Sequence, residues 1–160
     1  MFKWKAPKTE PSEEELKQNI PDLTSEYFIS PYWYVNGYVY FVYCSAIIIK
    51  ARCDGKEQKN LYCIDRTGDY DSFSLEILEI KDGYVYFRQE HKYTYRSDWY
   101  YDSDKTTAYY RVKTDKTMEL QEISWNKTGT YYDGGKFDNG SEIYDPPKVV
   151  KNPAKKKDTQ

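Results

Sequence analysis

The string Asn36-Gly-Tyr-Val-Tyr-Phe41 returns almost unchanged as Asp82-Gly-Tyr-Val-Tyr-Phe87, 46 residues further along the chain. Asn-Gly and Asp-Gly are the dipeptides that favour type I′ turns, in which both central residues have positive φ. Tyr, Val and Phe favour β-strands. Self-similarity at this spacing is typical of stacked supersecondary units. The two strings therefore predict two β-units, each built on a hairpin that leads into an aromatic strand.

The similarity extends beyond the two strings. Residues 47–55 (IIIKARCDG) align with residues 108–116 (AYYRVKTDK), so that each unit has a second strand ending in basic residues and then a turn centred on Asp. A 15-residue insertion separates the two strands in the second unit. We expect each unit to be an antiparallel meander.

The pattern resembles the low-density-lipoprotein-receptor-like β-propeller repeats of bacterial proteins. In these repeats each blade begins with Asn/Asp-Gly-Tyr and continues, after a loop, with Leu-Tyr-Arg-Ile-Lys-Asp-Gly. The residues that carry the resemblance are 36–41, 48–55, 82–87 and 109–115. It implies a propeller-type binding protein without an assigned activity. Closed propellers have four or more blades, so two units imply a partial propeller or one completed by two or three copies of the chain.

Composition supports an all-β chain. Of the 160 residues, 19 are Tyr, 6 are Phe and 4 are Trp, and such a length corresponds to one domain with a core of its own. Residues 1–26 form a polar arm in which Ser12 and Glu15 fit a capping box for a short helix. Residues 27–145 form the β domain, whose alternative architecture is a small closed barrel or sandwich. Residues 146–160 are rich in Lys and Pro and predict a disordered tail.

Expected strands cover 38–43, 47–53, 61–65, 73–80, 84–90, 107–113 and 119–124, with weaker signals at 130–132 and 142–144. Pro31 interrupts the aromatic segment 27–35, which suits an edge strand.

Charge and cysteine content exclude several classes of function. The net charge of −2 gives no general attraction to nucleic acid, and the longest apolar run, 38–49, is too short to cross a membrane. Cys44, Cys53 and Cys63 contain no CxxC pair, so with a single histidine they predict no zinc site. Without a leader after Met1 we expect a cytoplasmic protein; if Met1 replaces a removed signal, the alternative is a secreted or surface protein.

The insertion in the second unit is the candidate binding loop. Aromatic side chains alternate there with Arg and Asp, a composition that suits stacking on sugar rings and also suits protein hot spots. A third interpretation is a long two-stranded hairpin whose rings cover a neighbouring sheet. The candidate ligand-binding residues are Tyr93, Tyr95, Arg96, Asp98, Trp99, Tyr100 and Tyr101.

Catalysis and cofactor binding receive less support. The spacing Asp-x-x-x-Asp-x-Asp occurs at 65–71 and at 98–104 and could suit calcium, but both copies lack the Gly and the distal Glu of an EF-hand loop. His91 has no nucleophile near it in sequence, and no phosphate-binding glycine loop precedes a helix. We therefore expect no enzyme, no cofactor and no metal. A hydrolase based on paired carboxylates is the least favoured class.

The sequence thus predicts a non-catalytic binding module that recognises a protein or a carbohydrate through the aromatic loop, as a monomer or a homo-oligomer. The alternative is a small intracellular inhibitor or immunity-type protein that occludes a partner protein. No nucleic acid and no membrane insertion are expected.

Overall fold

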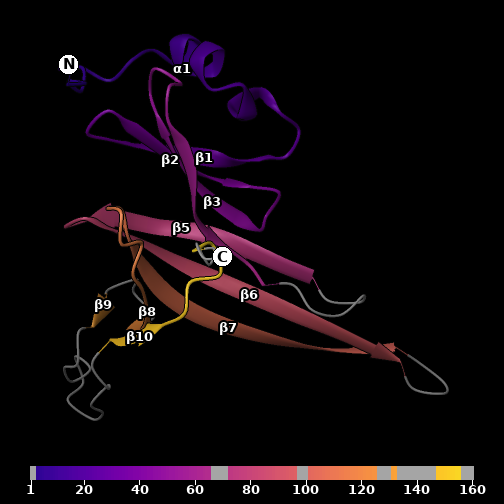
Figure 1. The fold of residues 1–160 in the computed structure, drawn as a ribbon. Helices are drawn as coiled ribbons and strands as arrows, with labels where there is room; N and C mark the ends of the chain where they lie inside the picture. Colours follow the sequence, from indigo (N-terminus) through magenta and orange to yellow (C-terminus); the bar gives the residue numbers. More distant parts are fainter. Residues whose placement is uncertain (1–2, 66–71, 97–100, 126–130, 133–146, 156–160) are drawn as a thin grey trace, which may run out of the picture.

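The computed structural model describes residues 3–65, 72–96, 101–125, 131–132 and 147–155. These residues form two antiparallel sheets and, next to the first sheet, two short helices (Figure 1). The layers follow the order of the chain, because the helices cover the first sheet and the first sheet lies on the second.

The first sheet contains four strands in chain order, namely β1 (Phe28–Val35), β2 (Tyr38–Tyr43), β3 (Ile47–Arg52) and β4 (Gln58–Cys63). Its edge strand β1 contains Pro31, and the register of β1 against β2 shifts between Ile29 and Trp33. An edge position with an irregular ladder accommodates proline, which has no N–H to donate. The edge strand predicted from Pro31 is therefore present.

The second sheet repeats this order with β5 (Ser72–Lys81), β6 (Tyr84–Arg96), β7 (Tyr101–Lys113) and β8 (Leu120–Trp125). On the far side of β8 lies β10 (Lys148–Val150), and β9 (Tyr131–Tyr132) also pairs with β8. The strands β1 to β4 and β5 to β8 thus each make up one sequence unit, and the repeated pentapeptide Gly-Tyr-Val-Tyr-Phe runs from the turn into the second strand of each unit.

The strand registers of the two units are equivalent. Tyr38 pairs with Arg52 in the first unit, and Tyr84 pairs with Lys113 in the second. Both turns at the start of the pentapeptide have two successive residues of positive φ, with Asn36 at 50° and Gly37 at 84°, then Asp82 at 52° and Gly83 at 80°. Positive φ at both positions is the type I′ geometry that the Asn-Gly and Asp-Gly dipeptides predict.

Hydrogen bonds at the far end of each unit match as well. The N–H of Cys53 donates to Gly37 O at 2.9 Å, and the N–H of Thr114 donates to Gly83 O at 2.9 Å. One residue earlier, Arg52 N donates to Glu57 O and Lys113 N to Glu119 O, at 2.8 and 2.9 Å. The sequence alignment of 47–55 with 108–116 therefore describes equivalent positions in space.

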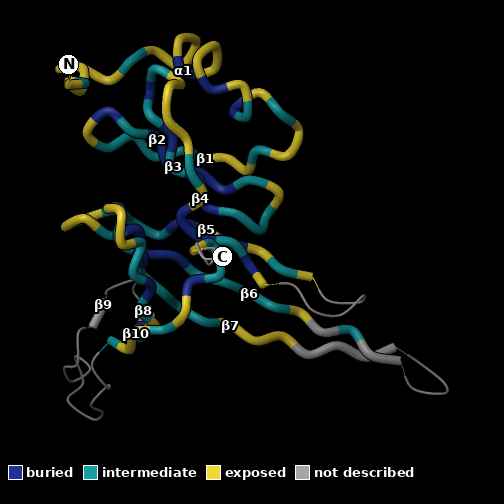
Figure 2. Tube along the Cα trace, in the orientation of Figure 1, coloured by how far each residue is buried: buried dark blue, intermediate teal, exposed yellow. Residues whose placement is uncertain are grey.

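The main core lies between the two sheets (Figure 2). The first sheet contributes Tyr40, Val42, Ile48 and Tyr62, and the second contributes, among others, Leu75, Ile77, Val85, Phe87 and Val112. The ring of Tyr62 lies 4.7 Å from that of Phe87 and 6.1 Å from that of Tyr110, between centroids. Aromatic rings from both sheets therefore meet in this core, among mostly aliphatic side chains.

The opposite face of the first sheet packs on the N-terminal segment. Helix α1 (Glu13–Asn19) begins at Ser12 with the predicted capping box, in which the Ser12 hydroxyl accepts from Glu15 N and the Glu15 carboxylate accepts from Ser12 N. The short 3-10 helix η1 (Pro21–Thr24) follows it. Leu16 and Leu23 from these helices, and Ile20 between them, are buried against Val39 and Phe41 of β2.

The C-terminal segment differs from the predicted disordered tail. Residues 148–150 form β10 on β8, and the buried side chain of Asn152 donates to Leu61 O at 2.8 Å and to Met118 O at 2.9 Å. These bonds satisfy backbone carbonyls of both units, which would otherwise be costly to bury. Lys and Pro dominate the composition of this stretch, so the prediction overlooked that one polar side chain and three strand residues can anchor it.

The all-β prediction is confirmed, and both sheets remain open in the described part of the chain, so no barrel is formed there. Both strands of the β6–β7 hairpin are longer than expected, since β6 continues to Arg96 and β7 begins at Tyr101. Among the described helices, none is long and apolar enough to cross a membrane.

Candidate functional site

The hairpin of β6 and β7 extends past the rest of its sheet. Among the described residues, the pairing of β5 with β6 reaches as far as Ser72, opposite Lys92. Pairing of β6 with β7 continues for four further positions, from Tyr93 opposite Asp104 to Arg96 opposite Tyr101. This two-stranded end projects from the second sheet (Figure 1).

The residue types explain why the backbone remains extended here. Tyr93-Thr-Tyr and Thr106-Thr lie in β6 and β7, and aromatic and β-branched residues favour strands. Of the interpretations that the sequence left open for this insertion, the backbone of residues 93–96 and 101–104 follows the long two-stranded hairpin rather than a loop. A two-stranded ribbon without a third strand has little stability of its own, so contact with another surface would stabilise it.

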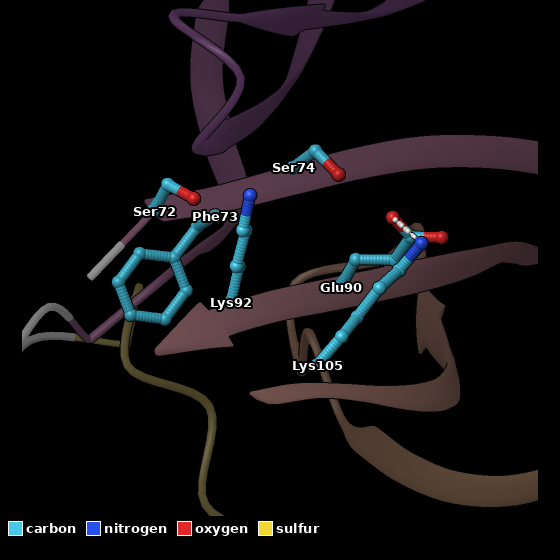
Figure 3. Close-up of a pocket in the computed structure, with 6 residues that line it drawn as sticks. All are labelled: Ser72, Phe73, Ser74, Glu90, Lys92 and Lys105. Atoms are coloured by element: carbon cyan, nitrogen blue, oxygen red, sulfur yellow. Dashed lines mark ion pairs between the residues drawn. The ribbon is translucent and has the colours of Figure 1, made fainter. Parts of the chain in front are cut away.

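A shallow hollow of about 370 Å³ lies at the base of this hairpin (Figure 3). Three neighbouring strands supply its lining: Ser72, Phe73 and Ser74 from β5, Glu90 and Lys92 from β6, and Lys105 from β7. The Lys105 Nζ lies 3.1 Å from Glu90 Oε1. Lys92 lies directly opposite Lys105 across the two strands. The hollow therefore offers hydroxyls, a carboxylate and two ammonium groups beside the projecting hairpin.

The inner face of the sheet at this level is occupied by packed side chains. The His91 ring stacks on Phe73 with centroids 4.1 Å apart and an angle of 14° between the planes. Two residues earlier on β6, Gln89 Oε1 accepts a hydrogen bond from the Tyr62 hydroxyl of the first sheet. Burial raises the pKa of Tyr62, so that its hydroxyl stays protonated and able to donate. The stack on Phe73 gives His91 a place in the packing of the second sheet.

The candidate ligand-binding residues fall into two groups. The backbones of Tyr93, Tyr95, Arg96 and Tyr101 lie in the projecting hairpin, on the two strands that face each other there. Asp98, Trp99 and Tyr100 lie outside the described residues. The structure thus brings the first four together at one end of the second sheet.

The two aspartate groups do not form a described metal site. Asp69, Asp71 and Asp98 lie outside the described residues, whereas Asp102 and Asp104 belong to β7 and Asp65 follows β4. Within the described ranges, no three His, Cys, Asp or Glu side chains come close enough to hold a metal ion. The three cysteines form no disulfide with one another; Cys53 is buried and Cys44 is exposed.

Sequence reasoning missed Glu90, Lys92 and Lys105 as neighbours of the hairpin. They lie on one face because residues two apart on a strand point to the same side and because Lys92 pairs with Lys105. The alternation Arg88, Glu90, Lys92 was visible in the sequence as a charged strand face. The register that adds Lys105 was not, since it depends on where the hairpin turns.

No protein-family model, curated protein or solved structure matches this chain. The likeness to propeller repeats therefore remains a prediction from the sequence.

Proposed function

We propose that this protein is a non-catalytic binding module that recognises a partner protein through the end of the β6–β7 hairpin and the hollow at its base. The observation that supports this most is the continuation of β6 and β7 for four residue pairs beyond the last pairing with β5 among the described residues. In the part of the chain that the structure describes, no strand pairs with either edge of this ribbon, and exposed edges are surfaces to which other chains add.

The residue types at this end support a protein as the ligand. Tyr, Trp and Arg are enriched among the residues that carry most of the energy of protein interfaces. The ribbon and the tip between its strands contain four Tyr, one Trp and one Arg within residues 93–101. The charged hollow beside them supplies polar groups of the kind found at the rim of such interfaces.

The test uses immobilised full-length protein to capture partners from the extract of its native cells, followed by affinity measurement with the captured protein in purified form. We expect the double variant Trp99→Ala/Tyr101→Ala to bind that partner at least roughly thirtyfold more weakly, as for the loss of one hot spot. The matched control is Tyr27→Ala, which removes an aromatic side chain that is 53% exposed and lies on the first sheet's side of the molecule.

Equal affinity of the hairpin variant and the wild type for the captured protein would refute the proposal. A glycan array with the wild type and the hairpin variant tests the carbohydrate alternative. If the wild type binds a glycan and the hairpin variant does not, the ligand is a carbohydrate and not a partner protein.

A further inference from the structure

A second hollow lies at the other end of the molecule, between the Asp-centred turns of the two units. It has a volume of about 580 Å³ and includes Tyr38 and Thr114 in its lining. Its charged lining consists of four lysines and two carboxylates: Lys50, Lys56, Lys59 and Lys116, with Glu57 and Asp115. We call this hollow the turn cleft. It shares no lining residue with the hollow beside the β6–β7 hairpin.

Both carboxylates of the turn cleft are engaged with other groups. Glu57 Oε2 lies 2.8 Å from Arg52 Nη1. Asp115 Oδ1 accepts hydrogen bonds from Thr117 N at 3.0 Å and from the Thr117 hydroxyl at 2.5 Å. Within the described part of the chain, Lys56, Lys59 and Lys116 make no ion pair. The cationic groups of the cleft therefore exceed the anionic groups available to them.

Lys50 lines the turn cleft and connects the two units by a hydrogen bond. Its Nζ donates to Thr114 O at 2.7 Å and lies 4.2 Å from the centroid of the Tyr38 ring. Lys59 lies directly opposite Lys50 on the neighbouring strand, on the same face. Burial lowers the pKa of Lys50 and the charge of Lys59 lowers it further, whereas the charges of Glu57 and Asp115 raise it in part. Like charges directly opposite each other destabilise a strand pair.

At the equivalent pair of positions, the second unit has a different residue opposite the cation. Arg111 is equivalent to Lys50, since Tyr40 pairs with Lys50 and Tyr86 pairs with Arg111. Its guanidinium lies 4.2 Å from the Tyr84 ring, as Lys50 lies from Tyr38. The residue opposite Arg111 is Gln121, whose Oε1 accepts from Arg111 Nε at 2.6 Å. A neutral acceptor thus stands where the first unit has a second cation.

We propose that the turn cleft is a binding site for a multivalent anion whose phosphoryl or carboxylate oxygens bridge Lys50 and Lys59. An anion between the two ammonium groups would replace their repulsion by two charge-assisted hydrogen bonds, which are the stronger kind. Lys56 and Lys116, on the two turns, stand at the rim and add long-range attraction. The site is separate from the hairpin, so it stands or fails independently of the proposed protein-binding function.

The chemistry admits two sources of the anion, a free small anion and an acidic segment of a polypeptide. Inorganic pyrophosphate serves as the probe for the first and a hexaglutamate peptide as the probe for the second. Isothermal titration of each probe into the full-length protein at constant ionic strength measures affinity. Lys59→Gln, which copies the residue of the second unit, is the test variant, and Lys8→Gln, at an exposed lysine of the N-terminal arm, is the control with the same change of charge.

We expect at least one of the two probes to bind, and Lys59→Gln to weaken that binding about tenfold or more, the loss of one hydrogen bond between charged groups. Lys8→Gln is expected to bind as the wild type does. The probe that binds more tightly identifies the source. Without any anion, Lys59→Gln is expected to unfold at higher temperature than the wild type, because the repulsion with Lys50 is removed.

A role of Lys59 in folding alone would give the opposite sign in that last measurement, since the variant would then be less stable. The proposal is overturned if neither probe binds to the wild type, or if the probe that binds does so equally well to Lys59→Gln.

Discussion

The two units of this protein share the pentapeptide, the turn that leads into it and the register of their second and third strands, but different neighbours cover their faces. In the first sheet, Phe41 points to the side covered by α1 and η1. In the second sheet, the equivalent Phe87 points to the first sheet. Side chains of the opposite face, such as Tyr40 and Val42, complete the first sheet's contact with the second. The N-terminal helices thus occupy the place that a preceding unit would have.

This difference shows how one local sequence serves two environments. The turn and strand are determined by residues that contact each other across a few positions, so both copies adopt the same backbone. What lies on each face is determined by the order of stacking, so equivalent residues contact a helix in one unit and a sheet in the other. Where the surroundings differ, the sequence differs as well, as at Lys59 and Gln121.

The two phenylalanines should reveal this difference most strongly. Phe41→Ala and Phe87→Ala each remove a fully buried ring and should each lower the free energy of unfolding by about 3–5 kcal/mol. We expect the larger loss for Phe87→Ala, because its ring contacts Tyr62 and Tyr110 between the two sheets. Urea denaturation of both variants measures the two values.

Limited proteolysis separates the two environments further. Phe41→Ala should increase cleavage within residues 12–24, since α1 and η1 lose part of their packing surface, whereas Phe87→Ala should not do so selectively. Equal cleavage of this segment in both variants would contradict the view that the helices stabilise only the first unit.

Alanine substitution of the turn glycines, Gly37 and Gly83, should lower the stability by an intermediate amount. Both adopt positive φ, so alanine at either position introduces backbone strain of roughly 1–3 kcal/mol. A Cβ at Gly83 would meet nothing within 4 Å, whereas a Cβ at Gly37 would lie 2.3 Å from Trp4 Cη2 and 2.8 Å from Ala6 Cβ. We therefore expect Gly37→Ala to be less stable than Gly83→Ala in thermal unfolding. When Trp4 is also replaced by alanine, the difference in melting temperature between the two glycine variants should become smaller. An unchanged difference would contradict a contact between residue 37 and Trp4.

Substitution of Asp54 or Asp115, in the turns between the third and fourth strands of the two units, should change the stability least. The bidentate contact with Arg52 lowers the pKa of Asp54 below its ordinary value of 3.8. The hydrogen bond from the Thr117 side chain lowers the pKa of Asp115. A carboxylate with a lowered pKa stabilises the folded state above its unfolded pKa, and this contribution is lost as the pH falls through the folded pKa.

We therefore expect Asp54→Asn to cost about 1 kcal/mol at neutral pH and to flatten the loss of stability below pH 3.8. Asp115→Asn should have a smaller effect of the same sign, because it has no bidentate arginine partner among the described contacts. The measurement is chemical denaturation of both variants between pH 2 and pH 7. A greater loss for Asp115→Asn would reverse the order that the Arg52 contact predicts.

Local signals in the sequence were reliable where neighbours along the chain decide the structure. The capping box at Ser12, the turns at Gly37 and Gly83 and the edge strand with Pro31 follow from such signals. The candidate site was harder to predict from the sequence. Tyr93 and Arg96 belong to extended strands, and Glu90 and Lys105 became neighbours only through the register of β6 with β7.

The sequence by itself determined the two units and their internal hairpins, because turn geometry and strand propensity act over a few residues. Only the tertiary structure decided how these units stack, that α1 covers one of them, and that Asn152 ties both to the C-terminal segment. It also decided that Lys50 reaches Thr114 across 64 residues and lies beside Lys59. The physical reason is that burial and charge contacts between distant segments depend on the packing of whole sheets, which no short stretch of sequence encodes.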